Sequence, residues 1–155
     1  MNCEVIMYHA IVRRKAAALF AAVSAGDAQP VLDGLAPHFE HFFLGESALG
    51  GRRTSLAATR AWYERLYRLL PDIAFDLRTM RISGPPWNTL IAVDWIETNS
   101  AGGVRTHTPG VHVVRLAWGR MTYLGIYPDT TVLVATLDRL HAAGVAEARA
   151  DKIEG

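Results

Sequence analysis

The sequence predicts an α+β fold in which helices come first and an antiparallel sheet follows. Apolar residues recur at helical spacing as far as residue 70, and from Ile73 onward they alternate with polar residues at a period of two. Helices followed by sequential strands are typical of an α+β domain with a meander. The 155 residues contain no repeat or linker, so we expect a single domain over 1–155, with a core of about 10–145 and a tail of 146–155.

Three helices are expected before residue 72. The first has an apolar face and ends at Gly26, a natural C-terminal stop. The second covers about 27–37, and the third runs from an N-cap at Ser55 to Pro71. Between the second and third helices, residues 38–43 read as a short strand.

Four strands are expected after residue 72. The alternation slips in phase between Leu77 and Met80, which predicts a β-bulge in the first strand. The others cover about 87–98, 104–118 and 121–127, separated by turns rich in glycine, and a closing helix follows. A curved sheet wrapped over helices leaves a cavity at one end, where we expect a ligand.

Charge and composition exclude several classes of partner. Lys and Arg number 16 against 15 Asp and Glu, so no strong field would attract nucleic acid or an anionic membrane. The lone cysteine, Cys3, cannot form an internal disulfide and is expected in a frayed terminus, as suits a reducing compartment. No apolar run is long enough for a signal peptide or a membrane span, so a cytoplasmic location is expected.

Several short strings, taken in order, resemble the SnoaL-like branch of the nuclear-transport-factor-2-like superfamily, which includes the ketosteroid isomerases. The strings span most of the chain and lie at residues 25–27 (AGD), 41–45 (HFFLG), 49–51 (LGG), 110–120 (GVHVVRLAWGR) and 127–130 (YPDT). The resemblance implies a cone-shaped NTF2-like fold, with three or four helices packed on a curved antiparallel sheet around one internal pocket. It does not transfer a reaction, because one fold hosts many activities.

The acids best known from that superfamily are missing here. Where ketosteroid isomerases carry a Tyr and a protonated Asp as an oxyanion hole, this chain carries Leu19 and His112, and Phe42 stands at the position of the Asp base. The acid of SnoaL-type cyclases falls near Ile126. Steroid-isomerase chemistry is therefore not expected.

His112 is the first candidate catalytic residue. It lies in an otherwise apolar strand, and its unperturbed pKa near neutrality suits a general acid or base. Asp94 interrupts another apolar strand, and a carboxylate that holds the imidazole would set its tautomer. Either Asp94 or its neighbour Trp95 points inward. His41 is the third catalytic candidate, from the opposite side of the pocket; each residue could equally be structural.

Five further residues are expected to contact the substrate. His107 qualifies only if a bulge at Pro109–Gly110 turns it to the same face as His112. Asp129 could instead cap the last helix. The five are Trp62, Tyr63, His107, Tyr127 and Asp129. No metal site and no cofactor are expected, because no ligand spacing or nucleotide motif is present.

Two hypotheses for function follow. The first is a cofactor-independent enzyme that isomerises, cyclises or dehydrates an apolar, oxygenated molecule of polyketide or terpenoid type. The second is a non-catalytic ligand-binding or assembly module of the same fold. We also expect a homodimer through the outer face of the sheet, with Ile91, Val93 and Val113 or their alternates in the interface.

Overall fold

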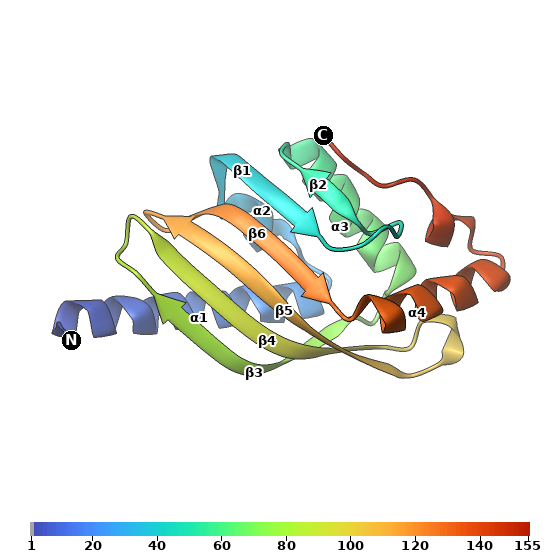
Figure 1. Cartoon of the computed structure of the whole chain (residues 1–155), viewed down its shortest axis with the longest axis horizontal. Helices are drawn as coiled ribbons and strands as arrows, with labels where there is room; N and C mark the ends of the chain where they lie inside the picture. The colour runs from blue at the N-terminus through green and yellow to red at the C-terminus, as the bar shows by residue number, and fades with distance from the viewer. Residues whose placement is uncertain (1) are drawn as a thin grey trace.

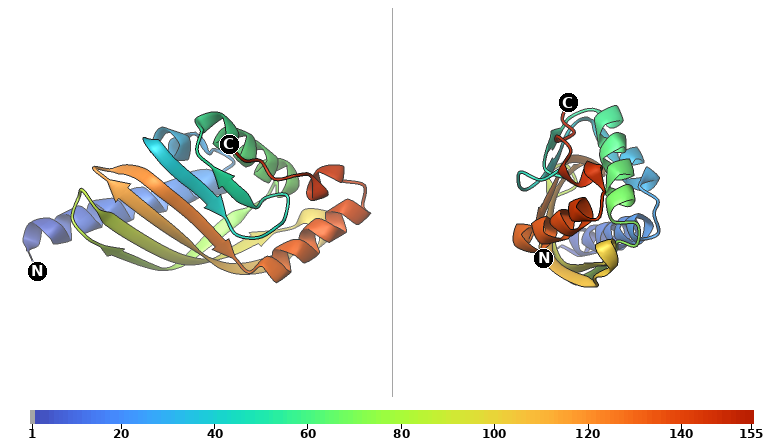
Figure 2. Two further views of the ribbon diagram at one scale, coloured as in Figure 1. Left: turned by 45° about the horizontal axis from the view of Figure 1, so that its top comes forward. Right: turned by 90° about the vertical axis from the view of Figure 1, so that its right-hand side faces the viewer.

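In a computed structural model that describes residues 2–155, helices α1, α2 and α3 pack on one face of a curved, unclosed sheet, and α4 lies at one end of it (Figure 1). The opposite face of the sheet carries no helix (Figure 2). The elements are α1 Cys3–Ser24, α2 Gln29–Asp33, β1 Leu35–Phe43, β2 Gly51–Arg53, α3 Leu56–Leu69, β3 Ala74–Ser83, β4 Thr89–Asn99, η1 Ala101–Gly103, β5 Thr106–Ala117, β6 Arg120–Pro128, α4 Thr130–Ala142 and η2 Ala146–Arg149.

The six strands are arranged in the order β2-β1-β6-β5-β4-β3. Strands β3 to β6 form an antiparallel meander, which confirms the expected run of strands after residue 72. Strand β1 pairs with β6 in parallel and with β2 antiparallel, so the segment between the helices extends the sheet. The strand itself was expected over residues 38–43, but its parallel pairing with β6 was not, because that contact joins segments far apart in the sequence.

The helix ends follow from capping side chains. Ser55 accepts a hydrogen bond from the Ala58 amide and begins α3, as expected. Asn2 accepts one from the Glu4 amide, so α1 begins at Cys3. Cys3 is thus the first residue of α1, and its side chain is exposed. No helix within residues 2–155 is long and apolar enough to cross a membrane.

Strand register decides which side chains reach the helices. The pairing of β3 with β4 shifts between Leu77 and Thr79, which confirms the predicted bulge. In contrast, β5 pairs with β4 without interruption from Thr106 to Leu116, so the bulge considered at Pro109–Gly110 is absent. Even-numbered residues of β5 therefore face the helices along its whole length.

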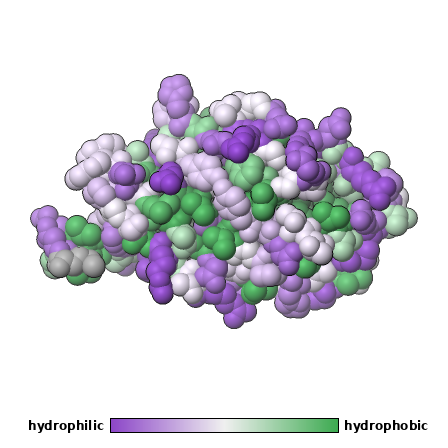
Figure 3. Space-filling view, viewed as in Figure 1, coloured by the Kyte–Doolittle hydropathy of each residue, from purple (hydrophilic) through white to green (hydrophobic). Residues whose placement is uncertain are grey.

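The outer face of the sheet carries an apolar patch over its central strands (Figure 3). Half-buried residues there include Ala92, Val111 and Val113. Ile91 and Val93 do not belong to this face, because both are almost fully buried on the inner side. The expected dimer interface therefore consists of the alternate residues, such as Ala92, together with Val113. The homodimer itself stays a prediction.

Two tryptophans lie at the tips of neighbouring hairpins. Trp87 follows β3 and Trp118 follows β5, and their ring centroids are 5.8 Å apart. Both are exposed, at 59% and 70%. Trp118 also has a φ of 53°, in the left-handed region, so its side chain turns away from the inner face on which His112 lies.

Candidate functional site

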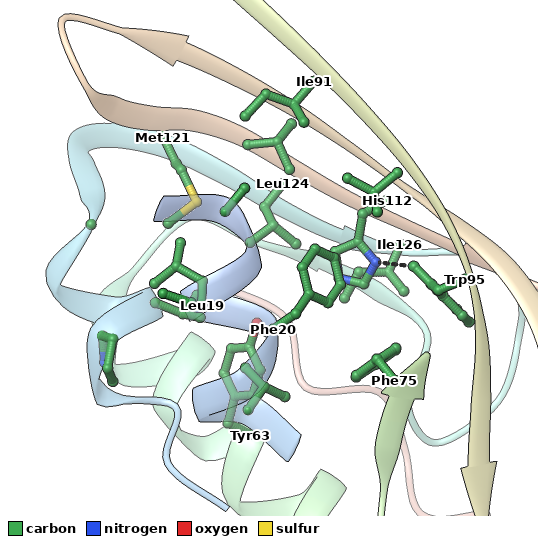
Figure 4. Close-up of a pocket in the computed structure, with 18 of the residues that line it drawn as sticks. Leu19, Phe20, Tyr63, Phe75, Ile91, Trp95, His112, Met121, Leu124 and Ile126 are labelled. Carbon is green, nitrogen blue, oxygen red and sulfur yellow. Dashed lines mark hydrogen bonds between the residues drawn. The ribbon is translucent and has the colours of Figure 1, made fainter. Parts of the chain in front are cut away.

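A cavity of about 440 Å³ lies between the inner face of the sheet and the helices. Its wall is mostly apolar, with contributions from α1, α2, α3, α4 and β3 to β6. Polar side chains on the wall include those of Glu97 and Thr108. Those of Tyr63 and His112 are also on the wall and are labelled in Figure 4. An apolar cavity with a few placed polar groups is the usual form of a small-molecule site.

His112 projects from β5 into this cavity, as its even position requires. The Trp95 indole Nε1 donates a hydrogen bond of 2.8 Å to His112 Nδ1, drawn as the dashed line in Figure 4. The rings of Phe20 and Phe75 lie edge-on to the imidazole, with centroids 4.7 and 5.8 Å away. These contacts hold the ring in one orientation.

Gly110 allows Trp95 to reach His112. Trp95 lies opposite Gly110 in the β4–β5 register, and His112 is the next inward residue along β5. A Cβ atom on Gly110 would lie 2.3 Å from Cη2 of the indole, far inside van der Waals contact. The missing side chain therefore provides the space in which the indole lies across β5.

The hydrogen bond from Trp95 determines the tautomer of His112. An indole nitrogen can only donate, so Nδ1 of the imidazole is the acceptor and carries no proton. Burial lowers the pKa of His112 to about 3, so the ring is neutral at neutral pH. Its proton is then on Nε2, at the far edge of the ring from the bond to Trp95.

Tyr63 is the second donor in the cavity. Its ring comes from α3, and its hydroxyl points into the same space as His112 (Figure 4). Burial raises the pKa of this phenol, so the hydroxyl keeps its proton. Trp62 forms part of the wall beside it and donates a 2.7 Å hydrogen bond to the Leu49 carbonyl oxygen.

Glu97 is a carboxylate on the cavity wall that sequence reasoning missed. Its residue is 6% exposed, and Oε1 accepts a 2.9 Å hydrogen bond from Asn99 Nδ2. Burial raises its pKa, and hydrogen bonds from Asn99 and Thr108 partly offset this. Strand alternation could have found it, because Glu97 shares the inward side of β4 with Trp95.

His41 is buried but does not line the cavity. Its Nδ1 accepts a 3.0 Å hydrogen bond from Arg53 Nε, and its ring packs against Trp62 and Tyr63. Burial, and then the charge of Arg53, lower the pKa of His41 well below its usual value. His41 therefore lies behind the wall, where it supports α3 and Arg53.

Arg53 is a fully buried cation that organises the backbone around it. It donates hydrogen bonds to the carbonyl oxygens of Gly50, Gly51 and Ile153, at 3.1, 2.9 and 2.7 Å. Through the last of these it holds the C-terminal segment against β2. Burial lowers the pKa of Arg53 to about 10, which still leaves it charged at neutral pH.

Two expected site residues of the meander face away from the cavity. Asp94 is exposed on the outer side of β4, because its neighbour Trp95 takes the inward position. The expected pairing of Asp94 with His112 is therefore wrong. His107 is exposed on the outer side of β5, since no bulge changes the parity of that strand.

Two further expected contacts also lie elsewhere. Tyr127 is on the outer side of β6, where its hydroxyl is hydrogen-bonded to that of Tyr123. Asp129 is exposed and accepts a 3.0 Å hydrogen bond from the Thr131 amide as the N-cap of α4. Within residues 2–155, no three His, Cys, Asp or Glu side chains are grouped so that they could hold a metal ion.

The family model described as a SnoaL-like domain matches residues 16–124, which is more than half of the chain. The chain belongs to the SnoaL-like family. No curated protein matches the sequence of this SnoaL-like protein at a significant level.

Solved structures show the same fold at low sequence identity. An NTF2-like protein of unknown function from Burkholderia pseudomallei K96243 superposes with a TM-score of 0.72 at 20% identity, over 80% of this chain and 95% of that one. A putative SnoaL-like polyketide cyclase from Jannaschia sp. CCS1 gives 0.61 at 13%, over 79% and 88%. TerC, co-crystallised with polyporic acid, gives 0.62 at 18%, over 83% and 96%. These likenesses establish the NTF2-like fold of this SnoaL-like protein.

Proposed function

We propose that this protein is a cofactor-independent enzyme that polarises a carbonyl group of an apolar, oxygenated small molecule. The observation that carries the proposal is the neutral Nε2–H of His112, held by Trp95 on the wall of an apolar cavity that Tyr63 also lines. Donors fixed in a dry site stabilise the negative charge that develops on a carbonyl oxygen. One such donor typically changes a rate by about 10²–10³.

This role differs from the general acid–base role expected from the sequence. A base at Nε2 would need the other tautomer, and that tautomer would lose the hydrogen bond from Trp95. The low pKa of His112 also disfavours an imidazolium as the proton donor. His112 and Tyr63 are therefore both neutral donors, suited to an enolate-like oxyanion.

Isomerisation, cyclisation and dehydration of polyketide-like substrates all develop charge on a carbonyl oxygen, and any of them fits such a site. The fold shared with a putative polyketide cyclase and with TerC, which was crystallised with polyporic acid, supports this substrate class. Glu97 is the only carboxylate of residues 2–155 on the cavity wall. It lies four residues along β4 from the level of His112, so proton transfer would involve water or the substrate itself.

A second candidate is a binding module without catalysis. The absence of a carboxylate beside His112 and Tyr63, among residues 2–155, favours it. The same two donors would then hold a ligand carbonyl without changing its reactivity.

2-Acetylnaphthalene, a flat apolar ketone, tests both candidates. Bound to the protein, its carbonyl stretching frequency should fall, and His112→Leu or Tyr63→Phe should reverse the fall and weaken binding about tenfold. His107→Leu, on the outer side of the same strand, should change neither. An unchanged frequency in His112→Leu would refute the carbonyl contact.

Deuterium exchange separates the two candidates. An enzyme that stabilises the enolate should accelerate exchange of the acetyl protons of this ketone in heavy water, and His112→Leu should abolish the acceleration. A binding module would bind the ketone without accelerating exchange.

A further inference from the structure

We propose that Glu97 is a specificity-determining residue whose carboxylate accepts a hydrogen bond from a hydroxyl group of the ligand, at the end far from the carbonyl. The inference rests on the proposed function and names its substrate class. The substrate would be an elongated, largely aromatic molecule with a carbonyl oxygen at His112 and a hydroxyl about 7–8 Å further along.

The strand register sets this spacing. Val93 is paired with His112, and Glu97 lies four residues further along β4 on the same face. Four residues of antiparallel strand span about 13 Å. A hydrogen bond of about 2.8 Å at each end leaves about 7–8 Å between the two ligand oxygens.

The cavity between these two anchors is lined by aromatic rings. Trp95 lies on β4 between the levels of His112 and Glu97, and Phe75, which is paired with Glu97, packs edge to face on it with centroids 4.9 Å apart. No polar atom other than the Trp95 N–H is offered by these two rings, and that atom is already bonded to His112. A flat, apolar ring system matches this interval.

Glu97 is suited to accept a hydrogen bond from the ligand. Asn99 donates to Oε1 and Thr108 is a second donor to the carboxylate, which still leaves acceptor sites free, because a carboxylate offers about four lone-pair sites. The other charged groups that act on Glu97 are those of Asp72 and Arg105, which are largely exposed and pair with each other. A buried carboxylate with few donors is costly, and a ligand hydroxyl would supply one.

The same spacing argues against Glu97 as the base for enolisation. The carbon next to a carbonyl lies only about 2.4 Å from the carbonyl oxygen. A base about 13 Å along the sheet from His112 cannot reach a proton on that carbon. Glu97 is therefore assigned to recognition.

Two probes that differ by one methyl group test the inference. 6-Hydroxy-2-acetylnaphthalene carries its two oxygens at about the required separation, and 6-methoxy-2-acetylnaphthalene lacks only the donor hydrogen. At neutral pH the wild-type protein should bind the hydroxy compound at least tenfold more tightly, as measured by calorimetry. Glu97→Gln should reduce this ratio to below threefold. Asp94→Asn, on the opposite face of the same strand, should keep it.

The outcomes separate this inference from the proposed function. If both ketones bind the wild type equally and His112→Leu weakens the binding of both, Glu97 does not recognise the hydroxyl, and the proposed carbonyl contact is retained. If His112→Leu weakens neither, both proposals fail. If Glu97→Gln does not fold, the ratio of the wild-type affinities for the hydroxy and methoxy ketones decides whether the hydroxyl is recognised.

Discussion

The hydrogen bond from Trp95 to His112 can be tested directly by a double-mutant cycle. Trp95→Phe keeps an aromatic ring against Phe75 and removes the indole N–H, which lies 2.8 Å from His112 Nδ1. His112→Leu removes the acceptor and keeps an apolar side chain of similar size. The double variant removes both partners, so the cycle isolates their interaction.

The expected magnitudes follow from burial. Trp95 is 2% exposed and His112 8%, so Trp95→Phe leaves a buried nitrogen unpaired at a cost of about 1–3 kcal/mol. The smaller ring leaves a void, which costs on the order of a further 1 kcal/mol. The free energy of unfolding should thus fall by about 2–4 kcal/mol, within the stability of a typical domain. The coupling energy should be about 1 kcal/mol.

Two measurements check this reasoning. Urea unfolding of the four proteins gives the coupling energy, and long-range ¹⁵N–¹H spectra report which ring nitrogen of His112 carries the proton. The wild type should show a proton on Nε2 only, and Trp95→Phe should show a mixture of tautomers. A coupling energy near zero, or a wild-type ring protonated on Nδ1, would refute the assignment of His112 as a fixed Nε2–H donor.

Two further predictions concern buried ionisable side chains. Arg53→Met removes a cation that supports three carbonyl oxygens and His41, so the free energy of unfolding should fall by about 3–5 kcal/mol. Arg52→Met, at the exposed neighbouring position, should cost far less than Arg53→Met, and equal losses would contradict the role of Arg53. The second prediction concerns pH. His112 has a pKa of about 3 when folded against 6.5 as a free side chain, so the unfolded chain binds more protons between these values and stability falls as the pH falls. From pH 7 to pH 5 the contribution of His112 is a loss of about 2 kcal/mol, His41 adds to it in the same direction, and His112→Leu should flatten the urea-unfolding profile.

Local patterns predicted the meander well. The change from helical to alternating periodicity marked β3, and the phase slip marked its bulge, because both arise from the positions of neighbouring apolar side chains. Ser55 was recognised as a cap for the same local reason. The parallel contact between β1 and β6 depends on residues far apart in sequence, which no local pattern encodes.

The site was harder to predict, because it depends on the direction of single side chains. Asp94 and Trp95 are adjacent, so one had to face inward, and the alternation of a long apolar strand did not decide which. Once Trp95 faces inward, strand alternation places Glu97 on the same face, and the indole N–H can reach His112. That bond also needs Gly110, whose role is visible only when the opposite strand is in place.

The four tryptophans divide into two optical classes. Trp62 and Trp95 are buried on the cavity wall, whereas Trp87 and Trp118 are exposed at the hairpin tips. Their fluorescence should therefore combine a blue-shifted emission that iodide cannot quench with a red-shifted emission that it can. Replacing Trp87 and Trp118 by Phe would leave a chain whose tryptophan fluorescence comes from the cavity wall alone. Such a chain could be used to screen compounds for binding without any label.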